Sequence, residues 1–259
     1  MIDIHCHPLP GVDDGAPTFE VAVEMCRMAA ADGVTHLVAT PHSNYTYTFD
    51  RELNKRLLAE LQEKVGEAPK LLLGCDCHLS YDNIQECVQN AKDFTINQTS
   101  YILVELPDQF IPEHISRVYY DIQVTGLVPI ITHPERNPLL HRKPQLLEQW
   151  VELGCLVQIT AQSYTGGFGS TACKFAERLL DAGLVHFFAS DAHNTKRRPP
   201  ILSTCYQKLE REFGKEIADL LLVQNPEAVI NGCTLPSQPD WEAAASSRKR
   251  SWFSSLFGR

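Results

Sequence analysis

Side chains that can bind metal ions recur directly after short apolar runs in this sequence. The segment "ITHPERNP" places His133 after such a run, "IDIHCH" supplies His5 and His7, and "SDAH" supplies Asp191 and His193. A single histidine in this position is most simply a loop cap or a core residue. Metal-binding side chains after many apolar runs have a different meaning, because the fold can bring the ends of these runs together at one place. The donors of this kind are His5, His7, His42, Asp76, Glu105, His133, Asp191 and His193.

These donors follow the predicted strands of a regular alternation. Short β-branched or aliphatic runs alternate with longer amphipathic segments, which predicts parallel strands joined by right-handed helical crossovers. An open doubly wound sheet and a closed barrel both agree with this order. The length of the chain and the regularity of the alternation favour an α/β barrel. Strands are expected over residues 2–5, 34–39, 71–74, 101–105, 128–132, 155–159 and 185–189.

In such barrels the carboxyl ends of the strands carry the active site, so the donors are expected to converge on one rim. Asp13 and Asp14, in the loop after the first strand, could reach the same place. Histidine and carboxylate together suit divalent ions such as Mn²⁺, Fe²⁺ or Zn²⁺. Eight donors exceed the three or four that one catalytic ion needs. The pattern therefore predicts two or three ions bridged by carboxylate.

Composition and charge limit the other classes of function. The 259 residues are 44% hydrophobic and carry a formal net charge of −9, which argues against a general nucleic-acid-binding protein. We find neither a signal-peptide pattern at the amino terminus nor an apolar run of about 18 residues, the length of a membrane span. Nine scattered cysteines are most simply reduced thiols. These features predict a cytoplasmic protein.

Several motifs together resemble one known family. "DIHCHPLPGVDDGA", "TPH", "VEL", "THPERN" and "SDAHN" followed by "RRPP" are similar to the PHP (polymerase and histidinol phosphatase) superfamily. They resemble most closely its bacterial tyrosine-phosphatase branch, the CpsB/YwqE type of capsule and exopolysaccharide systems. The resemblance covers residues 1–235. It implies a distorted seven-stranded (β/α) barrel of the TIM-like PHP fold, with a trinuclear metal site.

The resemblance also implies which side chains share each ion. The first set is His5, His7, Asp76 and Asp191, the second is Asp76, Glu105 and His133, and the third is Asp14, His42 and His193. The family usually has glutamate where this chain has Asp76. Aspartate is one methylene shorter, so bridging would need a small backbone shift or a weaker contact. Mn²⁺ is the expected metal, with Fe²⁺, Co²⁺ and Zn²⁺ as alternatives.

Two arginines match positions where the family binds phosphate. These are Arg136 of "PERN" and Arg198 of "TKRRPP", with the adjacent Arg197 as the alternative to Arg198. A guanidinium group is a planar fork that pairs with phosphate oxygens. The implied reaction is attack on phosphorus by a metal-bound water, with no covalent phosphoenzyme.

Two cysteine patterns suggest other chemistry and are interpreted as coincidences. Cys205 and Arg211 fit the C-x5-R pattern of cysteine-dependent tyrosine phosphatases, but the residues between them contain no glycine and are typical of a helix. That chemistry needs a glycine-rich loop whose amides cradle the phosphate. Cys75 and Cys77 flank Asp76 on a strand, so both should point away from the metal site.

Other segments are expected to border the site or to lie outside the barrel. Tyr45, Tyr47 and Phe49 could line the mouth of the pocket and stack on a tyrosine ring, or could simply pack. Residues 162–169, "QSYTGGFG", form a glycine-containing loop that could border it. Residues 236–259 form a basic and aromatic tail, expected either to be disordered or to bind a membrane surface as a short interfacial helix.

The sequence therefore predicts a metal-dependent protein-tyrosine phosphatase. The resemblance suggests a bacterial tyrosine kinase tail as its substrate and a homo-oligomer as its assembly. One alternative is a phosphoesterase for a small metabolite such as histidinol phosphate. A metal-dependent amidohydrolase is another, although two arginines beside the cluster favour phosphate. The non-enzymatic alternative is a non-catalytic partner protein that retains a metal site.

Overall fold

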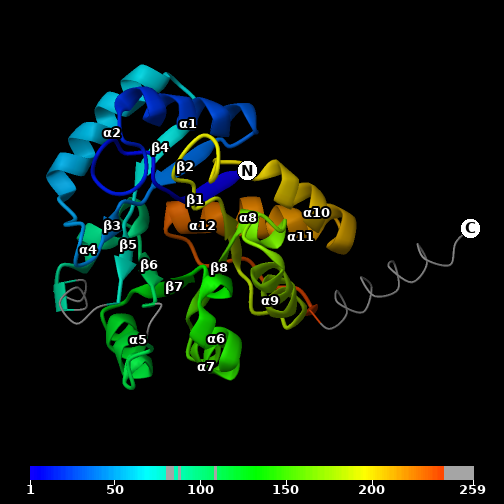
Figure 1. Ribbon diagram of the computed structural model, residues 1–259. Helices are drawn as coiled ribbons and strands as arrows, with labels where there is room; N and C mark the ends of the chain where they lie inside the picture. Colours follow the sequence, from blue (N-terminus) through cyan, green and yellow to red (C-terminus); the bar gives the residue numbers. More distant parts are fainter. Residues whose placement is uncertain (80–84, 87–88, 108–109, 242–259) are drawn as a thin grey trace, which may run out of the picture.

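Parallel strands form the centre of the molecule and helices surround them (Figure 1). The computed structural model describes residues 1–79, 85–86, 89–107 and 110–241. Every strand pairing within this part is parallel. The strands are β1 (Ile2–Cys6), β2 (His36–Ala39), β3 (His42–Ser43), β4 (Lys70–Leu73), β5 (Asp76–His78), β6 (Tyr101–Glu105), β7 (Val128–Thr132), β8 (Leu156–Thr160) and β9 (Phe187–Ala189).

The strands form two sheets, and backbone hydrogen bonds connect these sheets into one continuous array of strands. Their orders are β1-β2-β4 and β3-β5-β6-β7-β8-β9. Only two residues separate β2 from β3, and two separate β4 from β5. Backbone hydrogen bonds continue across this break, from Gly74 N to Ala39 O (2.8 Å) and from Asp76 N to Pro41 O (3.2 Å). If β2 with β3 and β4 with β5 are each counted as one interrupted strand, the barrel has seven strands, as the sequence predicts.

The array closes on itself between β9 and β1. Cys6 and Ala192 form an isolated parallel bridge. Asp191 N donates to His5 O at 2.8 Å, and His7 N donates to Ala192 O at 2.9 Å. The result is an α/β barrel distorted by the interrupted strands and by this short closure. The predicted fold class is therefore confirmed.

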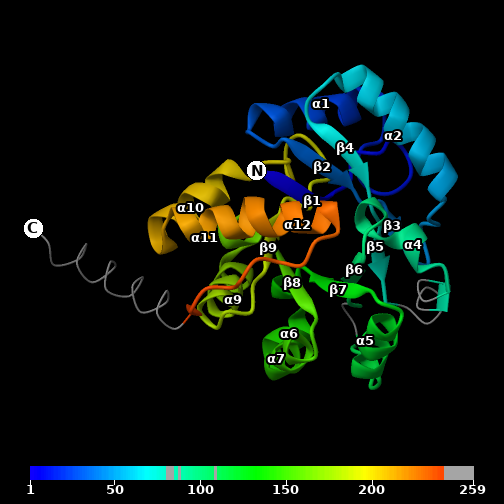
Figure 2. The same ribbon diagram turned by 180° about the vertical axis from the view of Figure 1, so that it is seen from behind.

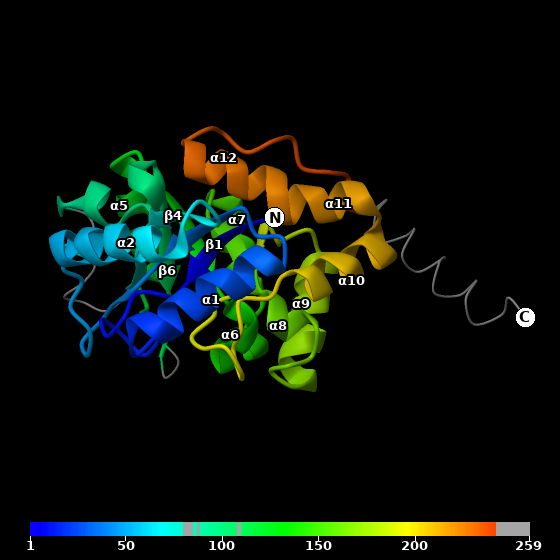
Figure 3. The same ribbon diagram turned by 90° about the horizontal axis from the view of Figure 1, so that it is seen from above.

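Helices cover the outside of the strands. They are α1 (Phe19–Ala31), α2 (Arg51–Val65), α4 (Ala91–Phe94), α5 (Ile115–Val124), α6 (Pro138–Arg142), α7 (Gln145–Glu152), α8 (Ala161–Tyr164), α9 (Ser170–Asp181), α10 (Ser203–Phe213), α11 (Lys215–Asp219) and α12 (Asn225–Asn231), with the single turns η1 (Ile96–Gln98) and η2 (Pro134–Arg136). The π-helical turn η3 (Leu220–Gln224) joins α11 to α12 in one row (Figure 3). None of the helices within the described ranges is long and apolar enough to cross a membrane.

Local sequence signals account for several helix ends. The Thr18 side chain caps α1 by accepting a hydrogen bond from Val21 N, and Asp50 caps α2 by accepting one from Leu53 N at 3.0 Å. Such caps satisfy backbone donors that the first helical turn leaves unpaired. Gly66 ends α2 with a positive φ of 87°, which glycine adopts without strain.

The strands carry different side chains on their two faces. Outward-facing residues such as Val104 and Ile131 belong to the large core under the helices. Inward-facing residues such as Leu103 and Ile130 form a second core, which α12 closes at the amino ends of the strands (Figure 2). Glu105 lies two residues beyond Leu103 on β6 and therefore points to the same inner face. The barrel interior is therefore apolar below and polar at the carboxyl ends.

The expectation of fully reduced cysteines is wrong at one position. The other cysteines of the described part are free thiols, but Cys77 is disulfide-bonded. Cys75 and Cys77 are both buried in the outer core, as expected from their alternation with Asp76. They therefore do not face the predicted metal site.

The described end of the chain packs back on the barrel. Gln238 donates to Asn225 Oδ1 at 3.4 Å, and the Trp241 ring lies 6.4 Å from that of Phe213. The domain boundary at residue 235 stays a prediction. Residues 242–259 of the predicted tail lie outside the described residues.

Candidate metal centre

The structure brings all nine predicted metal ligands together at the carboxyl ends of the strands. Their donor atoms include three overlapping groups, in each of which all atoms lie within 4.8 Å of one another. The groups are His7, Asp14, His42 and His193; His5, His7 and Asp76; and His42, Asp76 and Glu105. They come from β1, β3, β5 and β6, from the residues that follow β9, and from the loop before α1.

The most buried part of the centre contains the first implied ligand set. His5 Nε2 lies 3.1 Å from His7 Nε2 and 3.5 Å from Asp76 Oδ2. Asp191 Oδ1 lies 3.5 Å from the Nε2 atoms of both histidines. All four side chains are at most 1% exposed. This arrangement surrounds a small volume with two nitrogen and two oxygen donors.

The third implied set lies on the outer side of the centre. Asp14 Oδ1 is 3.4 Å from His42 Nε2 and 3.4 Å from His193 Nε2. The Asp14 side chain is half exposed. This set is therefore the one closest to solvent.

The second implied set connects these two. His42 Nδ1 lies 3.3 Å from Asp76 Oδ2 and 3.7 Å from Glu105 Oε2. His133 Nε2 lies 3.5 Å from Glu105 Oε1. His133 reaches the centre through this one carboxylate and is not a member of the three compact groups. The shorter Asp76 thus still reaches both of its histidine neighbours, His5 and His42.

Three histidines are oriented by an oxygen behind the ring. His5 Nδ1 is 2.9 Å from Gln158 Oε1, His7 Nδ1 is 2.8 Å from Asp13 Oδ2, and His193 Nδ1 is 3.0 Å from Asp191 O. Each oxygen favours the tautomer with the proton on Nδ1. The lone pair of Nε2 is then directed into the centre, as in protein metal sites.

Two of the ligands have a strained backbone conformation. His133 and Asp191 have positive φ angles of 35° and 50°. Residues other than glycine rarely adopt this region, at a cost of about 1–3 kcal/mol each. The strain places both side chains at the rim, directly beyond the ends of β7 and β9.

The loop before α1 leaves no room for a side chain at Gly15. A Cβ atom there would lie 2.1 Å from His7 O and 2.6 Å from His7 Cβ. Gly15 N also donates to Asp13 Oδ1 at 2.9 Å. The glycine of "DDGA" therefore lets Asp13 approach the back of His7.

The charges of the centre are strongly coupled in the protein alone. Burial lowers the pKa of His5, but the carboxylates of Asp76 and Asp191 outweigh it and raise the pKa to about 9. Burial also lowers the pKa of His42, while the adjacent carboxylates of Asp14 and Asp76 raise it to about 11. Burial and the adjacent Asp76 raise the pKa of Glu105 to about 8. The protein alone therefore favours the protonated forms of His5, His42 and Glu105.

Unpaired atoms support a fit to divalent cations. Asp76 Oδ2 and His42 Nδ1 are buried without a hydrogen-bond partner among the residues that the structure describes. Burying such groups unpaired is unfavourable, so they are expected to have another partner. Imidazole and carboxylate donors suit Mn²⁺, Fe²⁺, Co²⁺ or Zn²⁺. The residues present therefore fit the implied metal ions.

Both predicted phosphate-binding arginines lie at this centre. Arg136 Nη2 and Arg198 Nη2 donate to the same atom, Asp191 Oδ2, in the second case at 2.6 Å. Arg198 Nη2 also donates to Asp191 O at 3.0 Å. Arg197 is exposed, so the geometry favours Arg198 over it. Asp191 thus presents one oxygen to the histidines and the other to the arginines.

The aromatic residues after β3 divide into two groups. The Tyr47 ring stacks on His42 with ring centroids 6.2 Å apart, and Tyr45 is 90% exposed beside His78. Phe49 instead packs on Phe94. Tyr45 and Tyr47 are therefore placed to line the mouth, whereas Phe49 is a packing residue.

Cys205 and Arg211 do not form a phosphate loop. Both lie within α10, Cys205 is fully buried, and the Arg211 side chain is 72% exposed. Burial raises the pKa of the Cys205 thiol. The C-x5-R match therefore has no structural counterpart of an activated cysteine.

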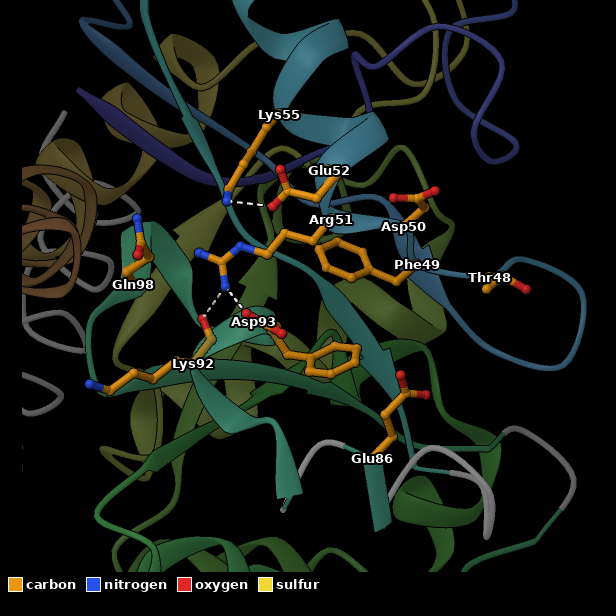
Figure 4. Close-up of a pocket in the computed structure, with 11 residues that line it drawn as sticks. Thr48, Phe49, Asp50, Arg51, Glu52, Lys55, Glu86, Lys92, Asp93 and Gln98 are labelled. Atoms are coloured by element: carbon orange, nitrogen blue, oxygen red, sulfur yellow. Dashed lines mark hydrogen bonds and ion pairs between the residues drawn. The ribbon is translucent and has the colours of Figure 1, made fainter.

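A separate hollow of about 690 Å³ lies between the start of α2 and α4 (Figure 4). None of the predicted metal ligands or phosphate-binding arginines lines it, although Phe49 does. Its charged groups are partly paired, since Arg51 contacts Asp93 and Lys55 contacts Glu52 at 2.7 Å. We therefore assign the chemistry to the metal centre rather than to this hollow.

Sequence reasoning missed the side chains that hold the ligands. It considered Asp13 only as a possible ligand and found no strong donor on the strand that contains Gln158. It placed Phe168 only in a loop that could border the site and did not connect its ring with the two arginines, which the ring faces. The signal available for Gln158 was its polar side chain on the inner face of an otherwise apolar strand.

The fold and the centre together define an α/β barrel protein of the PHP type with ligands for divalent cations. The chain belongs to the capsular polysaccharide synthesis family CpsB/CapC, whose family model matches residues 1–231.

Curated relatives and a solved structure agree with this assignment. The chain is 37% identical over 248 residues to the tyrosine-protein phosphatase YwqE of Bacillus subtilis (strain 168), covering 92% of this chain and 95% of that protein. It is 38% identical over 211 residues to the putative tyrosine-protein phosphatase CapC of Staphylococcus aureus, covering 80% and 82%.

A solved structure from work on YwqE of Bacillus subtilis and CpsB of Streptococcus pneumoniae superposes with a TM-score of 0.86 at 36% identity. The match covers 92% of this chain and 98% of that chain. Those proteins are described as unique metal-dependent tyrosine phosphatases.

Proposed function

We propose that this protein is a metal-dependent protein-tyrosine phosphatase. The observation that carries the proposal is the convergence of nine histidine and carboxylate side chains with two arginines at one barrel rim. Relatives that align over most of this chain are named tyrosine-protein phosphatases. The reaction is hydrolysis of a phosphoric monoester, with phosphotyrosine as the substrate group.

The three ligand sets would hold two or three divalent cations, with Mn²⁺ as the proposed metal. Bound cations supply a water nucleophile near neutral pH and neutralise charge on the phosphoryl group. Gln158 and Asp13 keep His5 and His7 in the tautomer that offers Nε2 to a cation. Asp76 is the carboxylate that belongs to two of the compact donor groups, so it would help to hold more than one cation.

Arg136 and Arg198 would bind the phosphoryl oxygens. Their Nε atoms are buried and have no hydrogen-bond partner within the part of the chain that the structure describes. Guanidinium donors of this kind stabilise the charge on a transferring phosphoryl group. The leaving tyrosinate has an ordinary pKa of about 10, so its departure needs only modest assistance.

The proposed biological substrate is the tyrosine-rich tail of a bacterial kinase that controls capsule or exopolysaccharide synthesis. The family description supports a link to capsular polysaccharide synthesis, and the relatives' names support a phosphotyrosine protein as the substrate. The kinase tail itself is suggested by the sequence resemblance. We also propose a cytoplasmic location, from the composition of the sequence, and a homo-oligomeric assembly, from the sequence resemblance.

The carboxyl-terminal sequence supports a further proposal of peripheral membrane contact. "RKRSWFSSLFGR" combines basic and aromatic residues. Co-sedimentation with anionic liposomes would compare the full chain with a truncation after Trp241, which packs on the barrel. Equal sedimentation of the two proteins would refute membrane contact through this segment.

A panel of substrates tests the proposed function. A phosphotyrosine peptide, a phosphoserine peptide and histidinol phosphate would be compared at saturating Mn²⁺, with His133→Ala as the inactive control. The proposal predicts clear preference for the phosphotyrosine peptide. Preference for histidinol phosphate would show that the protein is a metabolite phosphatase with the same metal chemistry.

A further inference from the structure

One aromatic ring contacts both phosphate-binding arginines. Phe168 lies in the loop between α8 and α9, and its half-buried ring is 4.9 Å from the guanidinium carbon of Arg136 and 5.8 Å from that of Arg198. Guanidinium groups are attracted to the face of an aromatic ring at this distance. The two arginines follow different strands, β7 and β9, so the ring is a contact that they share.

The loop that carries Phe168 is held in place. Gln162, in α8 just before the loop, donates from Nε2 to Arg197 O at 2.9 Å, which ties α8 to the segment that carries Arg198. A Cβ atom at Gly167 would lie 2.4 Å from Gln162 Cγ, so the turn before Phe168 closes tightly on Gln162. The position of the ring is therefore coupled to that of the arginines.

The arginine pair needs such support because its two positive charges lie close together. Asp191 Oδ2 accepts a hydrogen bond from both groups and compensates one of the charges. The Nε atoms of both arginines stay without a partner in the described part of the chain. The Arg136 and Arg198 side chains are 20% and 25% exposed, so an incoming dianion can reach their guanidinium groups.

We propose that Phe168 is a positioning residue that holds Arg136 and Arg198 as one anion receptor. The proposal rests on the proposed function, in which this receptor takes the phosphoryl group of phosphotyrosine. Phe168 offers no hydrogen bond, so it acts through the two guanidinium groups. Loss of the ring would allow the arginines to separate and would weaken phosphate binding without affecting the metal ligands.

The test compares Phe168→Ala, Phe168→Leu and Phe168→Tyr in the metal-loaded full chain. Kinetics with a phosphotyrosine peptide would give KM and kcat. Inorganic phosphate binding and Mn²⁺ binding would be followed by calorimetry, and stability by thermal melting. Tyr120→Leu is the matched control, because it removes a cation–π contact with Arg117 on the exposed face of α5, at 5.2 Å.

We expect Phe168→Ala and Phe168→Leu to raise KM and the dissociation constant of inorganic phosphate about tenfold, the size of one or two cation–π contacts. The change in kcat should be smaller, and Mn²⁺ binding should be unchanged. Phe168→Tyr, which keeps the ring, should restore both constants. Tyr120→Leu should change neither.

Two results would overturn the proposal. One is unchanged phosphate binding and KM in Phe168→Ala. The other is full function in Phe168→Leu, which would show that only apolar packing matters. If the parent protein failed to hydrolyse phosphotyrosine, the proposed function would fail, while the phosphate-binding comparison would still decide the role of Phe168.

Discussion

Replacement of Gln158 by leucine should weaken metal binding although Gln158 is not one of the proposed ligands. Its Oε1 atom lies 2.9 Å from His5 Nδ1, and both side chains are fully buried. Leucine has a similar volume but no acceptor. The imidazole would then keep a buried N–H without a partner, or move the proton to Nε2, where a cation is expected.

The expected magnitude follows from this one hydrogen bond. A buried donor without a partner costs about 1–3 kcal/mol, which corresponds to a factor of about 5–150 in an equilibrium constant. Loss of the group that orients a metal-binding histidine typically weakens metal affinity by about 10–100-fold. The two estimates overlap, so we predict that Gln158→Leu binds Mn²⁺ about 10–100-fold more weakly.

Calorimetric titration of Mn²⁺ into the chelator-treated proteins would measure this change. Asn225→Leu is the control, because it removes a buried amide hydrogen bond of 2.8 Å to His186 O at the opposite end of the barrel. Both variants should lose stability, but only Gln158→Leu should lose metal affinity. Mn²⁺ binding within about twofold of the parent in Gln158→Leu would refute the orienting role assigned to this residue.

Three further predictions concern Gly15, the buried Cys205 and the charges of the centre. Gly15→Ala should reduce Mn²⁺-dependent hydrolysis at least about tenfold, because the added Cβ must displace His7; unchanged kinetics would contradict this. Cys205→Ser should keep activity within about twofold, since the thiol is buried on α10; complete loss of activity in a folded protein would show that the cysteine motif is catalytic. The pKa values of His5 (about 9) and His42 (about 11) lie above the ordinary value of 6.5, so both should be protonated at pH 7 without metal. Because Mn²⁺ must displace these protons, its affinity should increase as the pH is raised from 7 to 9, by about tenfold per pH unit for each proton released. Calorimetry in two buffers of different ionisation enthalpy would count the protons, and an affinity independent of pH would contradict the prediction.

Much of the fold was predictable because strand ends are marked by composition. The seven apolar runs correspond to the seven strand positions, and the predicted donors lie at their carboxyl ends. The interruption of two strands was not predictable. The strands are interrupted between β2 and β3 and between β4 and β5. The first segment of each belongs to one sheet and the second segment belongs to the other.

The supporting side chains could not be assigned from the sequence. Gln158 and Asp13 act by contacts with His5 and His7, and the first of these joins residues 153 positions apart. Such contacts depend on the closed barrel and leave no local pattern. The disulfide-bonded state of Cys77 was likewise not indicated by the cysteine count.

The most direct test of the central claim follows metal content and hydrolysis in the same sample. The protein would be treated with a chelator and then titrated with Mn²⁺, while bound metal and phosphotyrosine hydrolysis are both measured. The account predicts no activity in the stripped protein and recovery that saturates when two or three equivalents are bound. Full activity in the stripped protein would contradict the account.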